Sequence, residues 1–315
     1  MFLWCVTIRT IFFIWVYIIN NYLLKTSLLT GLALIAFAAN SVLCRLALGN
    51  GAIDASSFTG IRLLSGAIAL FIILSLKGSI KGSNNGTSSK GSWSAAFTLF
   101  LYAITFSYAY LSVDTGTGAL ILFGSVQITM IMLSLLSGTR LHFIEWSGVI
   151  IAFTGFIYLI LPNITTPSID GFILMTVSGI SWGIYTLKGR GSKNPLMDTT
   201  YNFLRTIPFV ALLAIFTLHN MDYSSEGIIL ALISGAITSG VGYTIWYIAL
   251  GGLSSTQAAV IQLSVPVIAA IGGVIFVSET ITVRLVISAT IVLSGILMVV
   301  LGRYVFSSNQ CKVKR

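Results

Sequence analysis

Apolar residues fall into ten long runs along the chain, and short polar connections separate them. A bilayer core needs about 20 apolar residues per helix, and each run reaches that scale. The pattern therefore predicts an all-α polytopic membrane protein with ten transmembrane helices. The predicted spans are 27–48, 56–76, 93–112, 117–137, 144–161, 171–187, 199–218, 227–250, 256–277 and 283–302.

A further apolar stretch covers residues 2–24. If it crossed the membrane, Arg9 would lie within the bilayer, at a cost of roughly 2.5–3.5 kcal/mol on insertion scales. An extra transmembrane helix, an interfacial helix and an upstream translation start all fit the pattern. We set residues 1–25 apart as an N-terminal extension and expect no essential role for it.

The two halves of the chain resemble each other. Phe58 to Arg62 in the second span matches Tyr201 to Arg205 in the seventh, and a small hydroxyl pair precedes each stretch. Five spans are an odd number, so the second copy must cross the membrane in the opposite sense, as in many secondary transporters. We predict two inverted five-helix repeats, at 26–161 and 162–302, followed by a basic tail at 303–315.

Composition excludes water as the main solvent of this chain. Asp, Glu, Lys and Arg make up 8% of the residues and hydrophobic residues make up 56%. Soluble domains carry about 25% charged residues. Soluble enzymes and secreted disulfide scaffolds are therefore excluded. The three cysteines, Cys5, Cys44 and Cys311, are too scattered for a metal site. We expect no metal and no cofactor.

The formal net charge of +9 has a topological explanation. If the first of the ten helices enters from the cytoplasm, twelve basic residues fall in the inner connections and none in the outer ones. They are Lys25, Lys77, Lys81, Lys90, Arg140, Lys188, Arg190, Lys193, Arg303, Lys312, Lys314 and Arg315. The ten-helix unit is thus predicted to be N-in and C-in, and no nucleic-acid partner is needed.

With ten helices in a five-plus-five inverted repeat, the chain resembles the EamA-type carriers of the drug/metabolite transporter superfamily over 27–302. The stretches that carry the resemblance are 38–41 (AANS), 57–63 (SFTGIRL) and 262–267 (QLSVPV). The family also tends to place a Gly-Glu pair after the fourth and ninth helices; here Ser278-Glu279 keeps the Glu, whereas Gly138-Thr139 keeps only the Gly. The resemblance implies an exporter or facilitator of small metabolites, amino acids included.

Uncharged polar residues inside the spans predict a polar central cavity. Amides facing lipid would leave hydrogen bonds unmade, so Asn40, Gln127, Gln257 and Gln262 should face protein or water. Interhelical packing remains an alternative for each of them. Pro266 aligns with Gln127 across the repeat and should kink the ninth helix. Aromatic residues add candidates for the cavity wall, namely Tyr102, Trp182, Tyr185, Tyr243 and Trp246.

Arg62 and Arg205 occupy equivalent positions of the two repeats. Ionisable groups within a membrane are functional candidates. Either arginine could bind a substrate carboxylate or a gating partner, but their symmetric recurrence favours a structural role. No Asp, Glu or His falls in the middle of a span, which argues for facilitated diffusion or for coupling other than a proton relay.

We conclude that the sequence predicts a secondary carrier, not an enzyme. It contains no P-loop, so ATP does not power it. The predicted activity is the export or equilibration of small organic metabolites, with amino acids or related compounds as the expected class, across the bacterial inner membrane by alternating access. A drug or organic-cation exporter is the alternative among carriers, and a non-transporting sensor or assembly partner is the alternative outside them. A homodimer is left open.

Overall fold

The computed structural model describes residues 2–76, 90–136, 142–160, 167–253, 258 and 261–313. Helices follow all ten predicted spans, and the only β-structure among these residues is an isolated bridge between Ile53 and Tyr223. In chain order the helices are α1 (Phe2–Gly49), α2 (Ala55–Leu76), α3 (Trp93–Ala109), α4 (Thr115–Leu136), α5 (Phe143–Ile160), α6 (Ile169–Gly189), α7 (Pro195–Arg205), α8 (Ile207–Thr217), η1 (Leu218–Asn220), α9 (Ser225–Ile233), η2 (Ser234–Val241), α10 (Gly242–Leu250), α12 (Val265–Val277) and α13 (Val283–Val313).

The apolar helices match the dimensions of a bilayer. Five stretches are long and apolar enough to cross one: Leu24–Gly49, Ala55–Leu76, Thr115–Leu133, Pro195–Thr217 and Ser225–Leu250. Four shorter apolar helices, Trp93–Ala109, Phe143–Leu159, Val265–Val277 and Val283–Val299, lie between or after them. The predicted all-helical membrane fold is confirmed.

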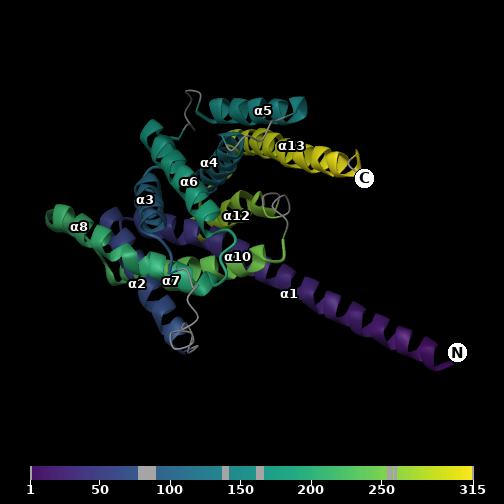
Figure 1. Cartoon of the computed structure of the whole chain (residues 1–315). Helices are drawn as coiled ribbons and strands as arrows, with labels where there is room; N and C mark the ends of the chain where they lie inside the picture. Colours follow the sequence, from purple (N-terminus) through teal and green to yellow (C-terminus); the bar gives the residue numbers. More distant parts are fainter. Residues whose placement is uncertain are drawn as a thin grey trace.

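Both terminal helices run beyond their spans. α1 continues through the N-terminal extension as one helix of 48 residues, about 72 Å long. That length is more than twice the roughly 30 Å of a bilayer core, and Figure 1 shows its first half projecting away from the other helices. At the other end, α13 continues through the basic tail as far as Val313.

Two of the predicted spans cross as single helical stretches but are not regular α-helices throughout. The seventh is divided at Thr206 into α7 and α8, because Pro208 at the start of α8 cannot donate its backbone hydrogen bond. The eighth runs through α9 and α10, with the π-helix η2 between them. In the ninth, a turn at residues 263–264 directly precedes Pro266, where the sequence predicts a kink.

Some of the main helix contacts recur when the two halves are exchanged. α6 packs against α3 and α4, and correspondingly α1 packs against α9, η2 and α10 and against α12. α5 and α13, the last helices of the two halves, pack along each other at one edge of the molecule (Figure 1). This exchange places α1, α2 and α3 of the first half around the same centre as α6, α7 and α10 of the second.

The closest approach between the halves lies where η2 crosses α2. A Cβ on Gly235 would lie 2.0 Å from the carbonyl oxygen of Arg62 and 2.0 Å from Ser65 Oγ. Only glycine fits at this crossing, because the backbone of α2 already fills the space that a side chain would need. The contact brings the hydroxyl-bearing residues of η2 beside the side chain of Arg62.

Candidate functional site

Arg62 lies at the centre of the molecule with only 1% of its surface exposed. Its Nη2 donates to the hydroxyls of Tyr102 at 2.9 Å and Tyr243 at 2.8 Å, and its Nε donates to Ser239 Oγ at 3.0 Å. The guanidinium also lies 4.9 Å from the centre of the Phe106 ring. Arg62 and its hydrogen-bond partners thus connect α2, α3, η2 and α10 in one polar cluster.

The charge of Arg62 is not neutralised by an acid. The ion pairs found among the described residues belong to Arg45, and Arg62 has no Asp or Glu within salt-bridge distance there. Its Nη1 is buried and has no hydrogen-bond partner in the described structure. A buried charge without a counter-charge is costly, and unpaired buried donors are rare. These two features make Arg62 a candidate ligand-binding group.

Asn40 of α1 organises the hydroxyls around this cluster. Its Nδ2 donates to the Tyr102 hydroxyl at 3.2 Å. Its Oδ1 accepts from Ser234 Oγ at 2.7 Å and from Thr238 Oγ1 at 3.2 Å, two residues one turn apart in η2. Because both the amide nitrogen and the amide oxygen of Asn40 form hydrogen bonds within the cluster, Asn40 holds α1 against η2.

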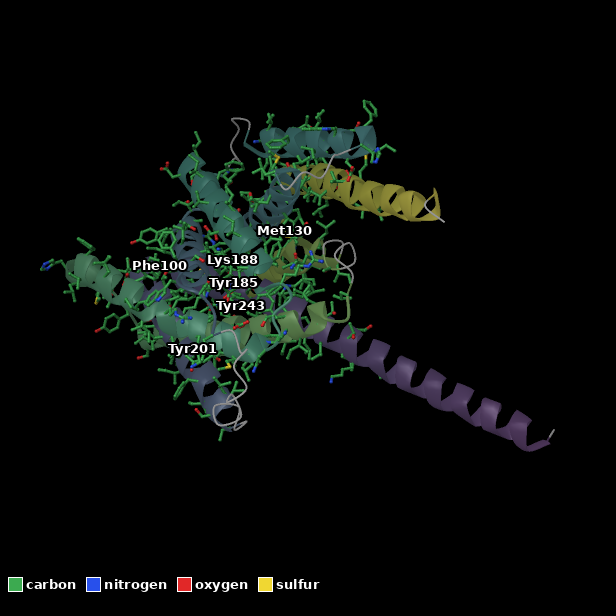
Figure 2. The ribbon with its side chains drawn as sticks, viewed as in Figure 1. Phe100, Met130, Tyr185, Lys188, Tyr201 and Tyr243 are labelled. Carbon is green, nitrogen blue, oxygen red and sulfur yellow. The ribbon has the colours of Figure 1, made fainter. Side chains whose placement is uncertain are left out.

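Aromatic rings surround the polar cluster. The Trp182 ring lies 4.5 Å from that of Tyr243, 5.0 Å from that of Tyr102 and 5.5 Å from that of Tyr185, measured between centroids. Figure 2 shows Tyr185 and Tyr243 in the interior of the helix bundle. Trp246 is buried too, and its indole Nε1 has no partner among the described residues. These rings exclude water from the space beside Arg62.

Gln127 and Gln262 meet across the two repeats. Gln127 Nε2 donates to Gln262 Oε1 at 3.4 Å, and both side chains are buried. Gln262 Nε2 has no partner within the described structure. Gln127 lies on α4, and Gln262 lies directly before the turn that leads to Pro266. Gln257 lies outside the described residues.

The eight predicted pathway residues are thus all buried in the described structure. Polar or ring contacts join six of them: Asn40, Tyr102, Tyr243, Trp182, Tyr185 and, through the ring of Phe37, Trp246. Gln127 and Gln262 form a separate pair. Whether substrate passes these residues stays a prediction.

The two symmetric arginines have different environments. Arg205 ends α7, where its Nη1 donates to the backbone oxygen of Lys90 and its guanidinium lies 5.8 Å from the Trp93 ring centre. Arg205 is only partly buried, whereas Arg62 is enclosed. Equivalent positions in the alignment therefore do not form equivalent sites. A structural or gating role for Arg205 and Pro266 stays a prediction.

A second charged cluster lies between α1, α4 and α12. Arg45 Nε donates to Glu279 Oε1 at 3.1 Å, and Nη2 lies 3.4 Å from Asp114 Oδ1. Glu279 also accepts the backbone N–H of Thr115 at 2.9 and 3.0 Å, so it caps the N-terminus of α4. Arg45 thus pairs with two acids from the connections at the same end of the bundle. Gly138-Thr139, the other family position, lies outside the described residues.

Two hydrogen-bonded clamps close opposite ends of the bundle. In the Asp54 clamp, Asp54 and Ala52 bind the backbone of Asp222 and Ser224, with N···O distances of 2.8 to 3.2 Å. The Asp198 clamp consists of Gly91, Ser92, Asp198 and Asn202. There Asp198 Oδ1 accepts from the Gly91 N–H, and Asn202 Oδ1 accepts from the Ser92 N–H, each at 3.0 Å. The clamps lie at opposite ends because α2, about 33 Å long, separates them.

Sequence reasoning assigned no site role to three contributors to the centre: Phe37, Phe106 and the hydroxyl-bearing residues of η2. Phe37 lies three residues before Asn40, on the same face of α1. Ser234 and Thr238 are four residues apart and share a face in the same way. Helical spacing from a known amide could have found Phe37, but the partners of all three depend on how the helices cross.

Comparisons with known proteins agree with this architecture. The model of the EamA-like transporter family matches residues 24–161 and 169–301. A solved structure described only as a crystal structure of a protein superposes with a TM-score of 0.59 at 16% sequence identity. It covers 86% of this chain, and the match covers 96% of that chain. At that identity the likeness concerns the fold alone.

Relatives come from several bacteria. An uncharacterized protein of Pseudomonas aeruginosa is 45% identical over 279 residues, which covers 89% of this chain and 96% of that protein. An uncharacterized transporter of Bacillus subtilis is 20% identical over 76% of this chain and 85% of its own. A Salmonella typhimurium protein named "Probable amino-acid metabolite efflux pump" is 23% identical over 64% of this chain and 72% of its own. The chain is therefore a multi-pass membrane protein, a transporter and not an enzyme, and it belongs to the EamA-like transporter family.

Proposed function

We propose that this transporter carries a small carboxylate-bearing metabolite, an amino acid or a related compound, by alternating access. The observation that carries the proposal is the buried guanidinium of Arg62, which has no acidic partner and keeps one donor nitrogen unpaired in the described structure. The name of the Salmonella relative supports the same class of solute.

A substrate carboxylate would supply the negative charge and the hydrogen-bond acceptor that Arg62 lacks in the described structure. Guanidinium and carboxylate match in geometry, and their hydrogen bonds are stronger than those between neutral groups. Two unit charges about 4 Å apart attract by about 4 kcal/mol at an effective dielectric constant of about 20. The carboxylate thus takes up the Nη1 donor, while Tyr102 and Tyr243 hold the opposite nitrogen in place.

The same charge argues against the alternative, an organic-cation exporter. The aromatic rings around Trp182 would suit a cation on their own. A cation at the carboxylate position would instead be repelled by Arg62 with a similar energy of about 4 kcal/mol. Measured flux of the solute across the membrane would indicate a carrier of either kind, and its absence would favour a non-transporting sensor or assembly partner.

Alternating access needs a closure at each end of the site. The Asp54 clamp and the Asp198 clamp each join the start of one helix to the start of a helix in the other half. In our proposal, opening one clamp while the other stays closed exposes Arg62 to one side at a time. Carboxylate binding lowers the cost of the closed state by neutralising the buried charge.

We also propose the bacterial inner membrane as the location, with both ends of the ten-helix unit in the cytoplasm. The support is the positive-inside distribution of Lys and Arg. In that orientation the Asp198 clamp faces the cytoplasm and the Asp54 clamp faces outward. Labelling of a single cysteine placed at Ser192 or at Asp222 by an impermeant reagent in intact cells tests the assignment.

Counterflow in proteoliposomes tests the carboxylate anchor. Vesicles loaded with L-alanine should take up labelled L-alanine, and ethylamine, which lacks the carboxylate, should not compete. Arg62→Gln should abolish the uptake, whereas Arg62→Lys, which keeps the charge but not the paired donors, should retain a fraction. Competition by ethylamine as strong as that by L-alanine would show that the carboxylate is not recognised.

A further inference from the structure

The ring of Phe37 lies at the meeting point of four other aromatic rings. Its centroid is 5.6 Å from that of Trp246, 5.8 Å from Trp182, 5.9 Å from Tyr243 and 6.3 Å from Phe123. These neighbours come from α4, α6 and α10, and Phe37 itself comes from α1. A single side chain therefore fills the aromatic space that both halves of the molecule enclose.

Phe37 also lies next to a buried donor that has no acceptor in the described structure. Trp246, whose ring contacts it, carries a buried indole N–H without a partner in the described structure. Tyr243 contacts the Phe37 ring with its own ring and accepts from Arg62 with its hydroxyl. The unpaired indole N–H distinguishes this position from an ordinary core phenylalanine, whose neighbours have satisfied hydrogen bonds.

Protein groups contact the face, the Nε and the Nη2 of the Arg62 guanidinium, and Nη1 has no partner in the described structure. Phe106 covers the guanidinium at 4.9 Å, and Ser239 of η2 binds its Nε. Asn40, one turn from Phe37 on α1, binds the Tyr102 hydroxyl that Arg62 also reaches. Tyr243 links the two positions, since its hydroxyl binds Arg62 Nη2 and its ring centroid lies 5.9 Å from that of Phe37.

From these contacts we infer that Phe37 is a specificity-determining residue. Its ring occupies the subsite for the substrate side chain and limits the transporter to small side chains. This inference rests on the proposed function, because it takes the carboxylate position at Arg62 as given. Removing the ring leaves an apolar space walled by aromatic rings, the kind of cavity that accepts a benzene-sized group.

The test compares side-chain selectivity rather than activity alone. Initial rates of counterflow are measured for L-alanine and L-phenylalanine in wild type, Phe37→Ala and Phe37→Leu. Phe37→Ala should raise the ratio of the phenylalanine rate to the alanine rate by at least about tenfold, and Phe37→Leu should raise it less, since differences of this size follow from a few methylenes in an apolar pocket. Phe156→Ala, which removes a buried ring between α5 and α6, is the matched control and should leave the ratio unchanged.

The outcomes separate the two proposals. An unchanged ratio in either Phe37 variant, with alanine uptake still lost in Arg62→Gln, would overturn the role of Phe37 and leave the carboxylate anchor standing. Absence of alanine and phenylalanine uptake by the wild type would overturn the proposed function and the inference with it. If the Phe37→Ala protein does not insert into the membrane, the selectivity ratio of Phe37→Leu decides between the outcomes, because leucine keeps most of the packing volume of the ring.

Discussion

Arg62 Nη2 donates a hydrogen bond to the Tyr243 hydroxyl at 2.8 Å, although the two residues are 181 positions apart. The bond joins α2 of the first half to α10 of the second in the interior of the protein. The same nitrogen reaches Tyr102, whose hydroxyl in turn accepts from Tyr243 at 3.0 Å. Relative movement of the two halves therefore changes the position of the one guanidinium that we place at the substrate.

Replacing Arg62 separates a binding role from a structural one. Arg62→Met removes a buried charge that has no acid to neutralise it in the described structure. Replacing a buried ion pair by apolar residues is often neutral or stabilising by about 1–4 kcal/mol, and a buried charge without a counter-charge is costlier still. We expect the thermal midpoint in detergent to stay level or rise while transport is lost. A clear fall in the midpoint would instead identify Arg62 as part of the scaffold.

The glutamine pair provides a second test of the pathway. Gln262→Leu removes a buried amide whose Nε2 has no partner among the described residues. Flux should fall while the amount of protein in the membrane stays the same, because the hydrogen bond that is lost, from Gln127 Nε2 to Gln262 Oε1, is long at 3.4 Å. Gln127→Leu, which removes the partner at 3.4 Å, should also impair flux. Wild-type flux in both variants would remove the pair from the pathway.

The crossing of η2 over α2 has no room for a side chain. Gly235→Ala would place a Cβ 2.0 Å from the Arg62 carbonyl oxygen. We expect a loss of stability of about 1–3 kcal/mol or more, since backbone must move to relieve the clash. Gly31→Ala is the matched control, because nothing lies within 4 Å of its added Cβ. Thermal unfolding in detergent measures both, and equal midpoints would contradict the close crossing.

Glu279 should matter more to stability than Asp114, although both contact Arg45. Glu279→Ala leaves the Thr115 N–H and the Arg45 Nε unpaired at a largely buried site, at a cost of about 1–3 kcal/mol. The Asp114 side chain is 58% exposed, and such surface pairs contribute about 0–1 kcal/mol. Thermal midpoints of Glu279→Ala and Asp114→Ala compare them, and a larger loss for Asp114→Ala would reverse our ranking.

The two clamps should have opposite effects on access to the centre. Asp54→Ala weakens the clamp at Asp222, and Asp198→Ala weakens the one at Gly91. A cysteine at Ser239, in a chain without the native cysteines, should label faster from the side whose clamp is weakened. Asp170→Ala, at an exposed helix start, is the control. Faster labelling from the same side in both clamp variants would exclude these clamps as gates.

Much of this fold was readable in the sequence because a bilayer imposes simple requirements. A span must be apolar over about 20 residues, and its amides must find partners away from lipid. These requirements alone predict ten helices and the burial of residues such as Asn40, Gln127 and Gln262, whereas the repeated halves follow from the match between 58–62 and 201–205. They also account for the scarcity of charged residues.

Contacts between helices were decided only by the tertiary structure. Arg62 and Arg205 look equivalent in the repeat, yet η2 and α10 enclose one and the end of α7 leaves the other partly exposed. The pairing of Arg45 with Glu279 and the ring cluster around Phe37 each join residues from distant parts of the chain. The pattern of apolar residues sets where each helix lies in the bilayer, but side-chain fit at the crossings determines which faces meet.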